Sequence, residues 1–471
     1  MKFETDNYKI EELTLNDETI RFRAFRNLTY VEYPVNEDYQ QMNIFVPEAY
    51  YEGKEINGYT LDTAPVFMPN LVGGFMPGKL GEPGYHKSDK TRLNSIFRAI
   101  MHGYVVAAPA IRGRVQKDAG GKYNGKAPAC IVDYKAAVRY LHYFSEVLPG
   151  DETKIITNGT SAGGALSSLM GAAGNHPDYE PYLKELGAAD ATDEIFAASC
   201  YCPITNLEHA DMAYEWEFQG VNDYHRTNMQ MDEGGRPSFT AEDGMMPEEQ
   251  IKVSKEEGKL FIQYINSLDL KDEDGQELKL DENGNGAFKE YVEKIVMESA
   301  QRSIDHKDLK KKEGSAEEKS WLTIENKKVT GMDFDGYVND ITRMKTAPAF
   351  DSLAMDSPEN DLFGNETNSH RHFTKYSQTN STSTGEMAED LIIKMMNPMD
   401  YINDKKADTA KYFRIRHGEC DRDTSLAISA ILTLKLRQAG CMVDYHSPWN
   451  VPHSGDYDLE ELFAWIDEIC K

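Results

Sequence analysis

The stretch TKIITNGTSAGGALSSLMGAAG, residues 153–174, decides the fold class of this chain. A short apolar strand, expected to end near Thr157, leads directly into Gly159-Thr160-Ser161-Ala162-Gly163, and a helix of small residues follows. Glycines two positions before and after the serine let a strand turn sharply into a helix without colliding with its neighbours. This is the pattern of a nucleophile elbow. It predicts Ser161 as a nucleophile and the amide of Ala162 as a donor to an oxyanion.

Composition limits the partners of the chain. Its 471 residues carry 51 Lys and Arg against 79 Asp and Glu, a formal charge of −28, so nucleic acid and anionic membranes should be repelled. The first residues lack the pattern of a signal peptide, and no apolar run reaches the roughly 20 residues that span a bilayer. Six cysteines without C-x-x-C spacing fit reduced thiols. We expect a soluble cytoplasmic protein, a monomer or weak homo-oligomer.

The order of apolar runs predicts an α/β domain with a large insertion. Strand-like runs such as YQQMNIFVP, APVFMPNLVGG and YVVAAPAIRG alternate with the helical patterns SIFRAIMHG and IVDYKAAVRYLHYF, which favours a mostly parallel sheet. From about residue 205 to 394 the chain is charged, rich in turns and without clear strand alternation, as expected of a mainly helical lid. The strands KYFRIRHG and CMVDYHSPW then resume the pattern. We therefore predict a catalytic domain of residues 1–204 and 395–471 and a lid of residues 205–394.

A serine at an elbow needs a general base. The expected order along the chain is the serine first, then an acid, then the histidine that serves as the base. Of twelve histidines, His453 lies between the last predicted strand and the last helix, the position expected for the base. His417 and His446 fall within predicted strands and are expected to be structural. His370 and His372 could suggest a metal pair, but no third ligand has suitable spacing, so a solvated loop is the favoured interpretation.

Two aspartates compete for the role of the acid. Both follow the strand KYFRIRHG in the loop ECDRD, one residue apart. Asp421 lies in the turn and is the better partner for His453, whereas Asp423 directly precedes a helix and is expected to cap it. A second oxyanion donor should come from Gly73 or Gly74, after an early strand; the sequence does not decide between them.

One further stretch could suggest a metal. The run DENGNG, residues 281–286, opens like a calcium-binding loop, but its twelfth position is Val292 where a glutamate is required. A tight polar turn is expected there, and no metal or cofactor is predicted for the chain.

Several of these motifs together resemble the bacterial tannases of the lactobacillus type. They are NLVGGFMPG, GTSAGGALS, KTAPAFDSLAMDSPEN, RHGECDRDTSL and PWNVPHSGDYDLEELFAW, and they cover most of the chain. The resemblance implies an α/β-hydrolase fold with an inserted lid, in which Ser161, His453 and Asp421 form the triad. It also implies that Lys345, Glu359 and Asp423 bind the hydroxyls of a galloyl ring. Lys345 and Glu359 carry no local signal of their own and would otherwise be interpreted as solvated lid charges.

The resemblance implies a small-molecule phenolic ester as substrate and a serine esterase that splits gallic acid esters without a cofactor. The first alternative is a feruloyl (hydroxycinnamoyl) or general carboxylesterase of the same fold. An alternative of another class is a catalytically silent hydrolase fold that serves as a binding module, against which the intact serine, histidine and acid argue.

Overall fold

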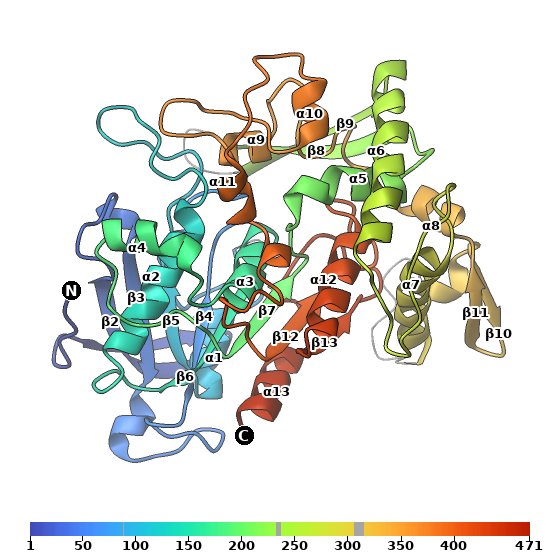
Figure 1. Ribbon diagram of the computed structural model, residues 1–471. Helices are drawn as coiled ribbons and strands as arrows, with labels where there is room; N and C mark the ends of the chain where they lie inside the picture. Colours follow the sequence, from blue (N-terminus) through green and yellow to red (C-terminus); the bar gives the residue numbers. More distant parts are fainter. Residues whose placement is uncertain (88, 232–236, 306–314) are drawn as a thin grey trace.

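The central feature of the computed structural model, which describes residues 1–87, 89–231, 237–305 and 315–471, is a nine-stranded sheet (Figure 1). Its strand order is β1-β2-β3-β5-β4-β6-β7-β12-β13. The strands span Lys9–Leu15 (β1), Glu18–Thr29 (β2), Gln41–Pro47 (β3), Pro65–Pro69 (β4), Val105–Pro109 (β5), Asp151–Thr160 (β6), Ala197–Tyr201 (β7), Tyr412–Arg416 (β12) and Met442–His446 (β13).

The sheet is parallel from β5 to β13 and antiparallel at its other edge, where β1, β2 and β3 pair. Strands β4, β5 and β7 are buried along their whole length. A strand covered by helices on both faces needs apolar side chains on both, which explains their unbroken apolar runs. The predicted parallel sheet is confirmed, while β1 and β2 were not expected.

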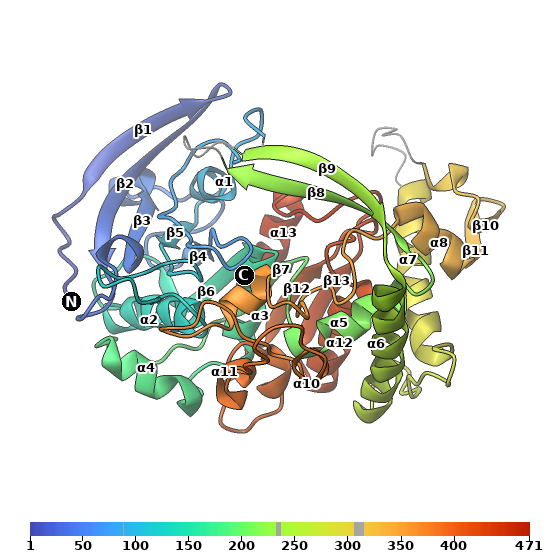
Figure 2. The same ribbon diagram turned by 90° about the horizontal axis from the view of Figure 1, so that it is seen from above.

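Helices cover both faces of the sheet (Figure 2). Helices α1 (Ser95–His102) and α13 (Leu459–Cys470) pack together on one face. The other face carries α2 (Ala129–Tyr143), α3 (Ala162–Ala172) and α12 (Leu426–Gln438), and α4 (Glu180–Glu185) packs against α2. The expected α/β-hydrolase arrangement is therefore confirmed.

Residues 205–394 contribute no strand to the large sheet in the ranges that the structure describes. Their helices are α5 (Leu207–Glu217), α6 (Glu248–Ser267), α7 (Ala287–Asp305), α8 (Phe334–Ile341), α9 (Pro358–Leu362), α10 (Lys375–Thr379) and α11 (Asp390–Lys394). Two antiparallel hairpins, which the sequence pattern did not reveal, accompany them: β8–β9 (Asp223–Met231 and Pro237–Met245) and β10–β11 (Leu322–Glu325 and Lys328–Met332). The longer hairpin extends away from α6 and α7 (Figure 2).

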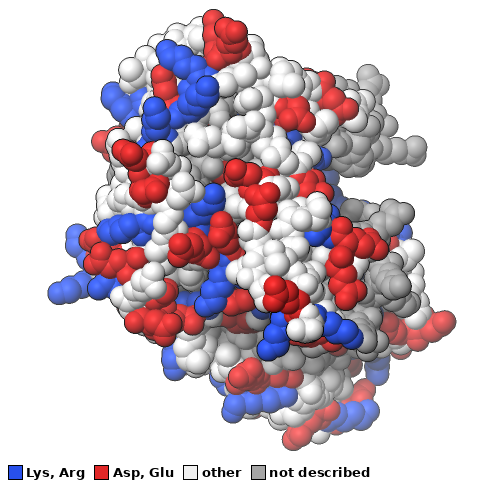
Figure 3. Space-filling model, turned by 90° about the vertical axis from the view of Figure 1, so that its right-hand side faces the viewer, with Lys and Arg blue, Asp and Glu red and all other residues white. Residues whose placement is uncertain are grey.

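Acidic side chains and those of Lys and Arg are interspersed on the face drawn in Figure 3. Among the helices that the structure describes, none has both the length and the apolar character needed to cross a bilayer.

Candidate active site

Ser161 occupies a sharp turn between β6 and α3. Its φ of 61° and ψ of −123° are unusual for a residue with a side chain, which is the strain expected at an elbow. A Cβ atom on Gly163 would lie 2.4 Å from Asn70 Oδ1, and one on Gly159 would lie 2.2 Å from the carbonyl oxygen of Gly163. Both glycines are therefore sterically required. Strand β6 continues to Thr160, further than the sequence pattern indicated.

The structure brings His453 and Asp421 into contact. Asp421 lies in the turn after β12 and His453 in the loop between β13 and α13. The Nδ1 atom of His453 is 2.7 Å from Oδ2 of Asp421, while Oδ1 of the same carboxylate accepts a hydrogen bond from the backbone of Asp423. Asp421 is buried, and each of its oxygens has a separate partner.

Cys202 connects the histidine loop to the elbow. Its Sγ atom is 3.9 Å from Nε2 of His453 and 3.4 Å from the carbonyl oxygen of Ser454. On the other side, the backbone N–H of Ser161 donates to the carbonyl of Tyr201, the residue before Cys202. Within the described residues no hydrogen bond joins the Ser161 hydroxyl to His453; in ligand-free hydrolases this bond is often long and tightens only with substrate.

The charges at this centre shift two pKa values in opposite directions. Burial lowers the pKa of His453, but Asp421, Cys202 and Asp423 together raise it well above its ordinary value. Burial raises the pKa of Asp421, but His453 and His417 outweigh that effect and leave the pKa below its ordinary value. The resting pair thus favours an imidazolium beside a carboxylate. His453 must lose its proton before it can act as a base, so activity should rise with pH.

Donors for an oxyanion lie on two sides of Ser161. The N–H of Ala162, in the first turn of α3, has no acceptor among the described residues, and neither do those of Gly73 and Gly74 in the loop after β4. Asn70 holds this loop against the elbow: its Nδ2 donates to the carbonyls of Asn158 and Gly163. Free backbone amides beside a strained serine can stabilise a tetrahedral intermediate.

The charged residue Lys345, in the segment 205–394, reaches the same centre. Its Nζ is 2.6 Å from Oδ1 of Asp423 and lies 3.8 Å from the centre of the Phe350 ring. The second oxygen of Asp423 is 3.8 Å from Nε2 of His453. Asp423 therefore lies between His453 and Lys345, and Lys345 is not a solvated charge.

The expected helix cap at Asp423 is wrong. Helix α12 begins at Leu426, and the side chain of Ser425 accepts the hydrogen bond from the backbone of Ala427. Asp423 is thereby left to pair with Lys345. Burial raises the pKa of Asp423, but Lys345 and His453 lower it to about 2, so it is ionised at any working pH.

Glu359 lies in the first turn of α9 and is 7% exposed, contrary to the interpretation as a solvated charge. Burial raises the pKa of Glu359; Lys345 opposes this shift and Asp423 adds to it. The side chains of Lys345, Asp423 and Glu359 thus act on one another electrostatically beside the catalytic centre. Such a group can both accept hydrogen bonds from phenolic hydroxyls and donate to them.

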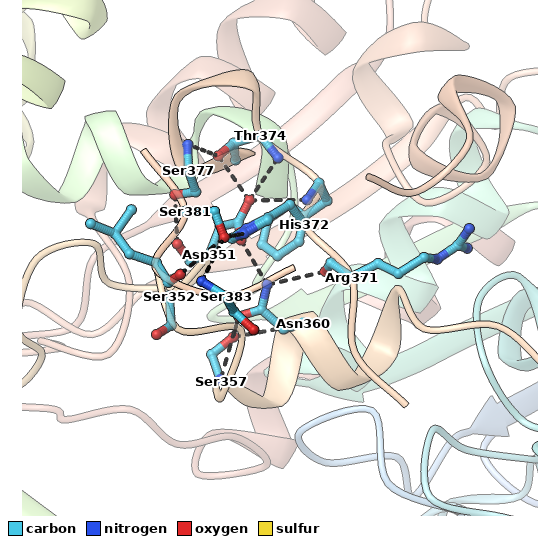
Figure 4. A network of polar contacts seen from close by, with 12 residues as sticks. Asp351, Ser352, Ser357, Asn360, Arg371, His372, Thr374, Ser377, Ser381 and Ser383 are labelled. Carbon is cyan, nitrogen blue, oxygen red and sulfur yellow. Dashed lines mark hydrogen bonds and ion pairs between the residues drawn. The ribbon is translucent and has the colours of Figure 1, made fainter. Parts of the chain in front are cut away.

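Asp351 fixes the segment that carries Glu359 (Figure 4). One oxygen of Asp351 accepts a hydrogen bond from Asn360 Nδ2 and lies 2.6 Å from His372 Nδ1; the other accepts bonds from the backbone and hydroxyl of Thr374. Asn360 also belongs to the capping box of α9. His372 is buried, so the solvated loop expected there is wrong for this residue.

The remaining metal candidates have other partners. Ligand atoms of Cys202, Asp421 and His453 lie within 4.8 Å of one another, but a hydrogen bond already joins the side chains of Asp421 and His453. In the DENGNG turn, Oδ1 of Asp281 accepts bonds from the backbones of Asn283 and Asn285, which forms the polar turn that was predicted. His417 is buried with Nδ1 2.9 Å from Ser429 Oγ, as a structural histidine would be.

A strained serine between a strand and a helix, next to a His–Asp pair that follows it in the chain, defines the class of α/β-hydrolases. Comparisons with known proteins narrow this class. Residues 83–231 match the family model described as BD-FAE. A search of curated proteins found no match.

Solved structures match the whole chain. A tannase from Lactobacillus plantarum is 44% identical with a TM-score of 0.95, covering 100% of this chain and 98% of that chain. The tannase of Fusobacterium nucleatum is 47% identical with a TM-score of 0.93, covering 100% and 99%. A tannin acyl hydrolase in complex with ethyl gallate is 44% identical with a TM-score of 0.92, covering 100% and 98%. The chain belongs to the tannase family.

Proposed function

We propose that this protein is a serine esterase that hydrolyses esters of gallic acid. One observation carries the proposal: the ion pair of Lys345 and Asp423 lies beside His453, with the buried Glu359 in electrostatic reach. A galloyl ring offers three coplanar hydroxyls, and two carboxylates with an ammonium can satisfy them. The solved relative in complex with ethyl gallate supports this choice of substrate.

The chemistry follows from the geometry of the elbow. Ser161 loses its proton to Nε2 of His453 and attacks the ester carbonyl, while Asp421 stabilises the imidazolium that forms. The resulting oxyanion accepts hydrogen bonds from Ala162 and from Gly73 or Gly74. His453 then protonates the departing alcohol. Water attacks the acyl-enzyme with His453 again as base, and gallate leaves.

Turnover of three esters tests the substrate. Methyl gallate should have the highest kcat/KM, followed by methyl ferulate and p-nitrophenyl acetate, because a site with buried charges rejects a ring that leaves them unpaired. A preference for either of the other two esters would replace the proposal with a feruloyl or general carboxylesterase.

Loss of the nucleophile tests the mechanism separately. Ser161→Ala should retain the fold and the affinity for gallate but hydrolyse none of the three esters, and it should not react with a fluorophosphonate. Labelling of a serine other than Ser161 in the intact protein would contradict the assignment. Absence of labelling in a folded protein would instead favour a binding module.

The proposal also covers the domain organisation, location and oligomeric state of the enzyme. It divides the chain into a catalytic domain of residues 1–204 and 395–471 and a lid of residues 205–394. The proposal also includes a cytoplasmic location and a monomeric or weakly homo-oligomeric state. The six free cysteines support the location, because a reducing compartment keeps thiols unpaired. Light scattering during gel filtration would test the oligomeric state.

A further inference from the structure

The loop that supplies the second oxyanion donor has a strained backbone. Gly74 and the next residue, Phe75, both have positive φ, +54° and +53°. Phenylalanine rarely adopts this conformation, because its Cβ crowds the backbone there. The backbone N–H of Met76 donates to the carbonyl of Gly73 at 3.0 Å and closes the turn. Such a conformation persists only where surrounding groups hold it.

Arg114, in the loop after β5, holds this turn at two points. Its backbone N–H donates to the carbonyl of Phe75 at 3.0 Å, and its Nε donates to the carbonyl of Gly74 at 2.9 Å. The preceding residue, Gly113, lies directly against the loop: a Cβ atom there would be 2.3 Å from the carbonyl carbon of Met76. Arg114 is therefore the side chain that fixes the peptide plane between Gly74 and Phe75.

The far end of the same guanidinium reaches the lid. Nη1 of Arg114 forms an ion pair with Oδ2 of Asp361, two residues after Glu359 on α9. Asp361 is also bound by Lys126 through its other oxygen. The side chains of Arg114 and Asp361 are 16% and 10% exposed, so the contact is shielded from solvent. The rigid guanidinium fixes the directions of Nε, toward the Gly74 carbonyl, and of Nη1, toward the Asp361 carboxylate, relative to one another; the single ammonium of a lysine has no such fixed geometry.

We propose that Arg114 is a positioning residue that aligns the second oxyanion donor and ties it to the galloyl-binding part of the lid. In a trans peptide the C=O and the following N–H point in opposite directions. Holding the carbonyls of Gly74 and Phe75 keeps the turn closed, so the Gly73 carbonyl stays bonded to the Met76 N–H. The N–H of Gly74 belongs to the same peptide as the Gly73 carbonyl, so it is fixed in the opposite direction as a free donor. This inference rests on the proposed function for the role of the 73–75 loop in binding the oxyanion.

Kinetics of Arg114 variants test the proposal. Arg114→Gln should lower kcat about 10- to 100-fold, as expected when a catalytic donor is displaced rather than removed. The loss should appear with p-nitrophenyl acetate as well as with methyl gallate, since both reactions pass through an oxyanion. For p-nitrophenyl acetate KM should stay within about threefold, because ground-state binding does not use the loop. Arg114→Lys should be nearly as slow as Arg114→Gln.

Lys122→Ala is the matched control. Lys122 lies on the same loop as Arg114 and pairs with Glu366 in the same lid segment; within the described residues it has no hydrogen bond or ion pair with Gly74. Its loss should leave kcat unchanged for both esters. Arg114→Ala provides a chemical rescue test. Added methylguanidinium should restore part of the kcat of this variant without changing its melting temperature, which would not be expected if Arg114 served stability alone.

Two results would overturn the proposal. One is an Arg114→Gln enzyme that hydrolyses p-nitrophenyl acetate at the normal rate. The other is a loss confined to KM for methyl gallate, which would limit Arg114 to holding the lid. Failure of the proposed function looks different: the unmodified protein would prefer esters other than gallate, while the effect of Arg114 on p-nitrophenyl acetate would remain measurable.

Discussion

Replacing Asp423 with alanine should separate recognition of the galloyl ring from ester hydrolysis itself. The carboxylate of Asp423 is ionised, with a pKa of about 2, and lies 2.6 Å from the ammonium of Lys345. A hydrogen bond from a phenol to a charged acceptor contributes about 1.5–3 kcal/mol. Its loss should therefore lower kcat/KM for methyl gallate about 10- to 150-fold, at roughly 1.4 kcal/mol per factor of ten.

Hydrolysis of p-nitrophenyl acetate should respond differently. This ester has no phenolic hydroxyl on its acyl group, so it does not need the carboxylate. Asp423 also contributes to the raised pKa of His453, and its removal should leave more of the histidine in the neutral form that accepts a proton. We therefore expect the variant to hydrolyse p-nitrophenyl acetate at least as fast as the unmodified enzyme near neutral pH.

The neighbouring acid provides the matched control. Asp421→Asn should slow both esters by about 10⁴-fold, the loss that follows when the acid of a serine-hydrolase triad becomes asparagine. The two esters are assayed in separate reactions, and melting curves confirm that both variants are folded. An equal loss of both activities in Asp423→Ala, or full retention of methyl gallate hydrolysis, would refute the separation of roles.

Further predictions follow from pKa values and packing. The acid limb of kcat/KM for p-nitrophenyl acetate should have its midpoint above 6.5, the ordinary pKa of histidine, and Asp423→Asn should move that midpoint down. Burial and neighbouring acids raise the pKa of Glu257 on α6 from 4.5 to about 9, so this group should lower stability progressively as pH rises between these values, because the folded state binds its proton more tightly. The melting temperature of Glu257→Gln should then fall less between pH 6 and 9 than that of the unmodified protein. Gly163→Ala places a methyl group 2.4 Å from Asn70 Oδ1 and should reduce the free energy of unfolding by about 1–3 kcal/mol in urea.

The parallel part of the sheet could be predicted because strands buried on both faces appear in the sequence as unbroken apolar runs. Strand β2 also carries a signal, since Ile20, Phe22 and Ala24 alternate inward, but its charged outward residues obscure it. The hairpin β10–β11 was harder to find. Its turn places Asn326 and Lys327 at positive φ, where glycine is the usual marker, so the sequence lacks the expected signature.

The residues of the site also differ in how far the sequence could predict them. Ser161, Asp421 and His453 could be selected because chain order and flanking elements restrict them, and the structure places Asp421 and His453 in contact. Lys345 and Glu359 were predicted only from the resemblance, because the fold of the segment 205–394 brings them to the centre through contacts that no local pattern encodes. Cys202 and Arg114 were missed altogether. A buried cysteine and a loop arginine are common, and only the fold brings them next to His453 and Gly74.

The one-residue spacing of the two aspartates links chemistry to recognition. Oδ2 of Asp421 faces His453, while Oδ1 accepts the backbone N–H of Asp423 and so fixes the residue that pairs with Lys345. In Asp421→Asn the amide oxygen should keep the bond to that N–H, because an NH₂ group there would leave it without an acceptor. The NH₂ group then faces Nδ1 of His453, which forces the proton onto Nε2 and prevents it from accepting one from Ser161. This variant should therefore bind gallate with unchanged Kd in calorimetry while hydrolysing both esters about 10⁴-fold more slowly; weakened gallate binding would mean that the turn itself had moved.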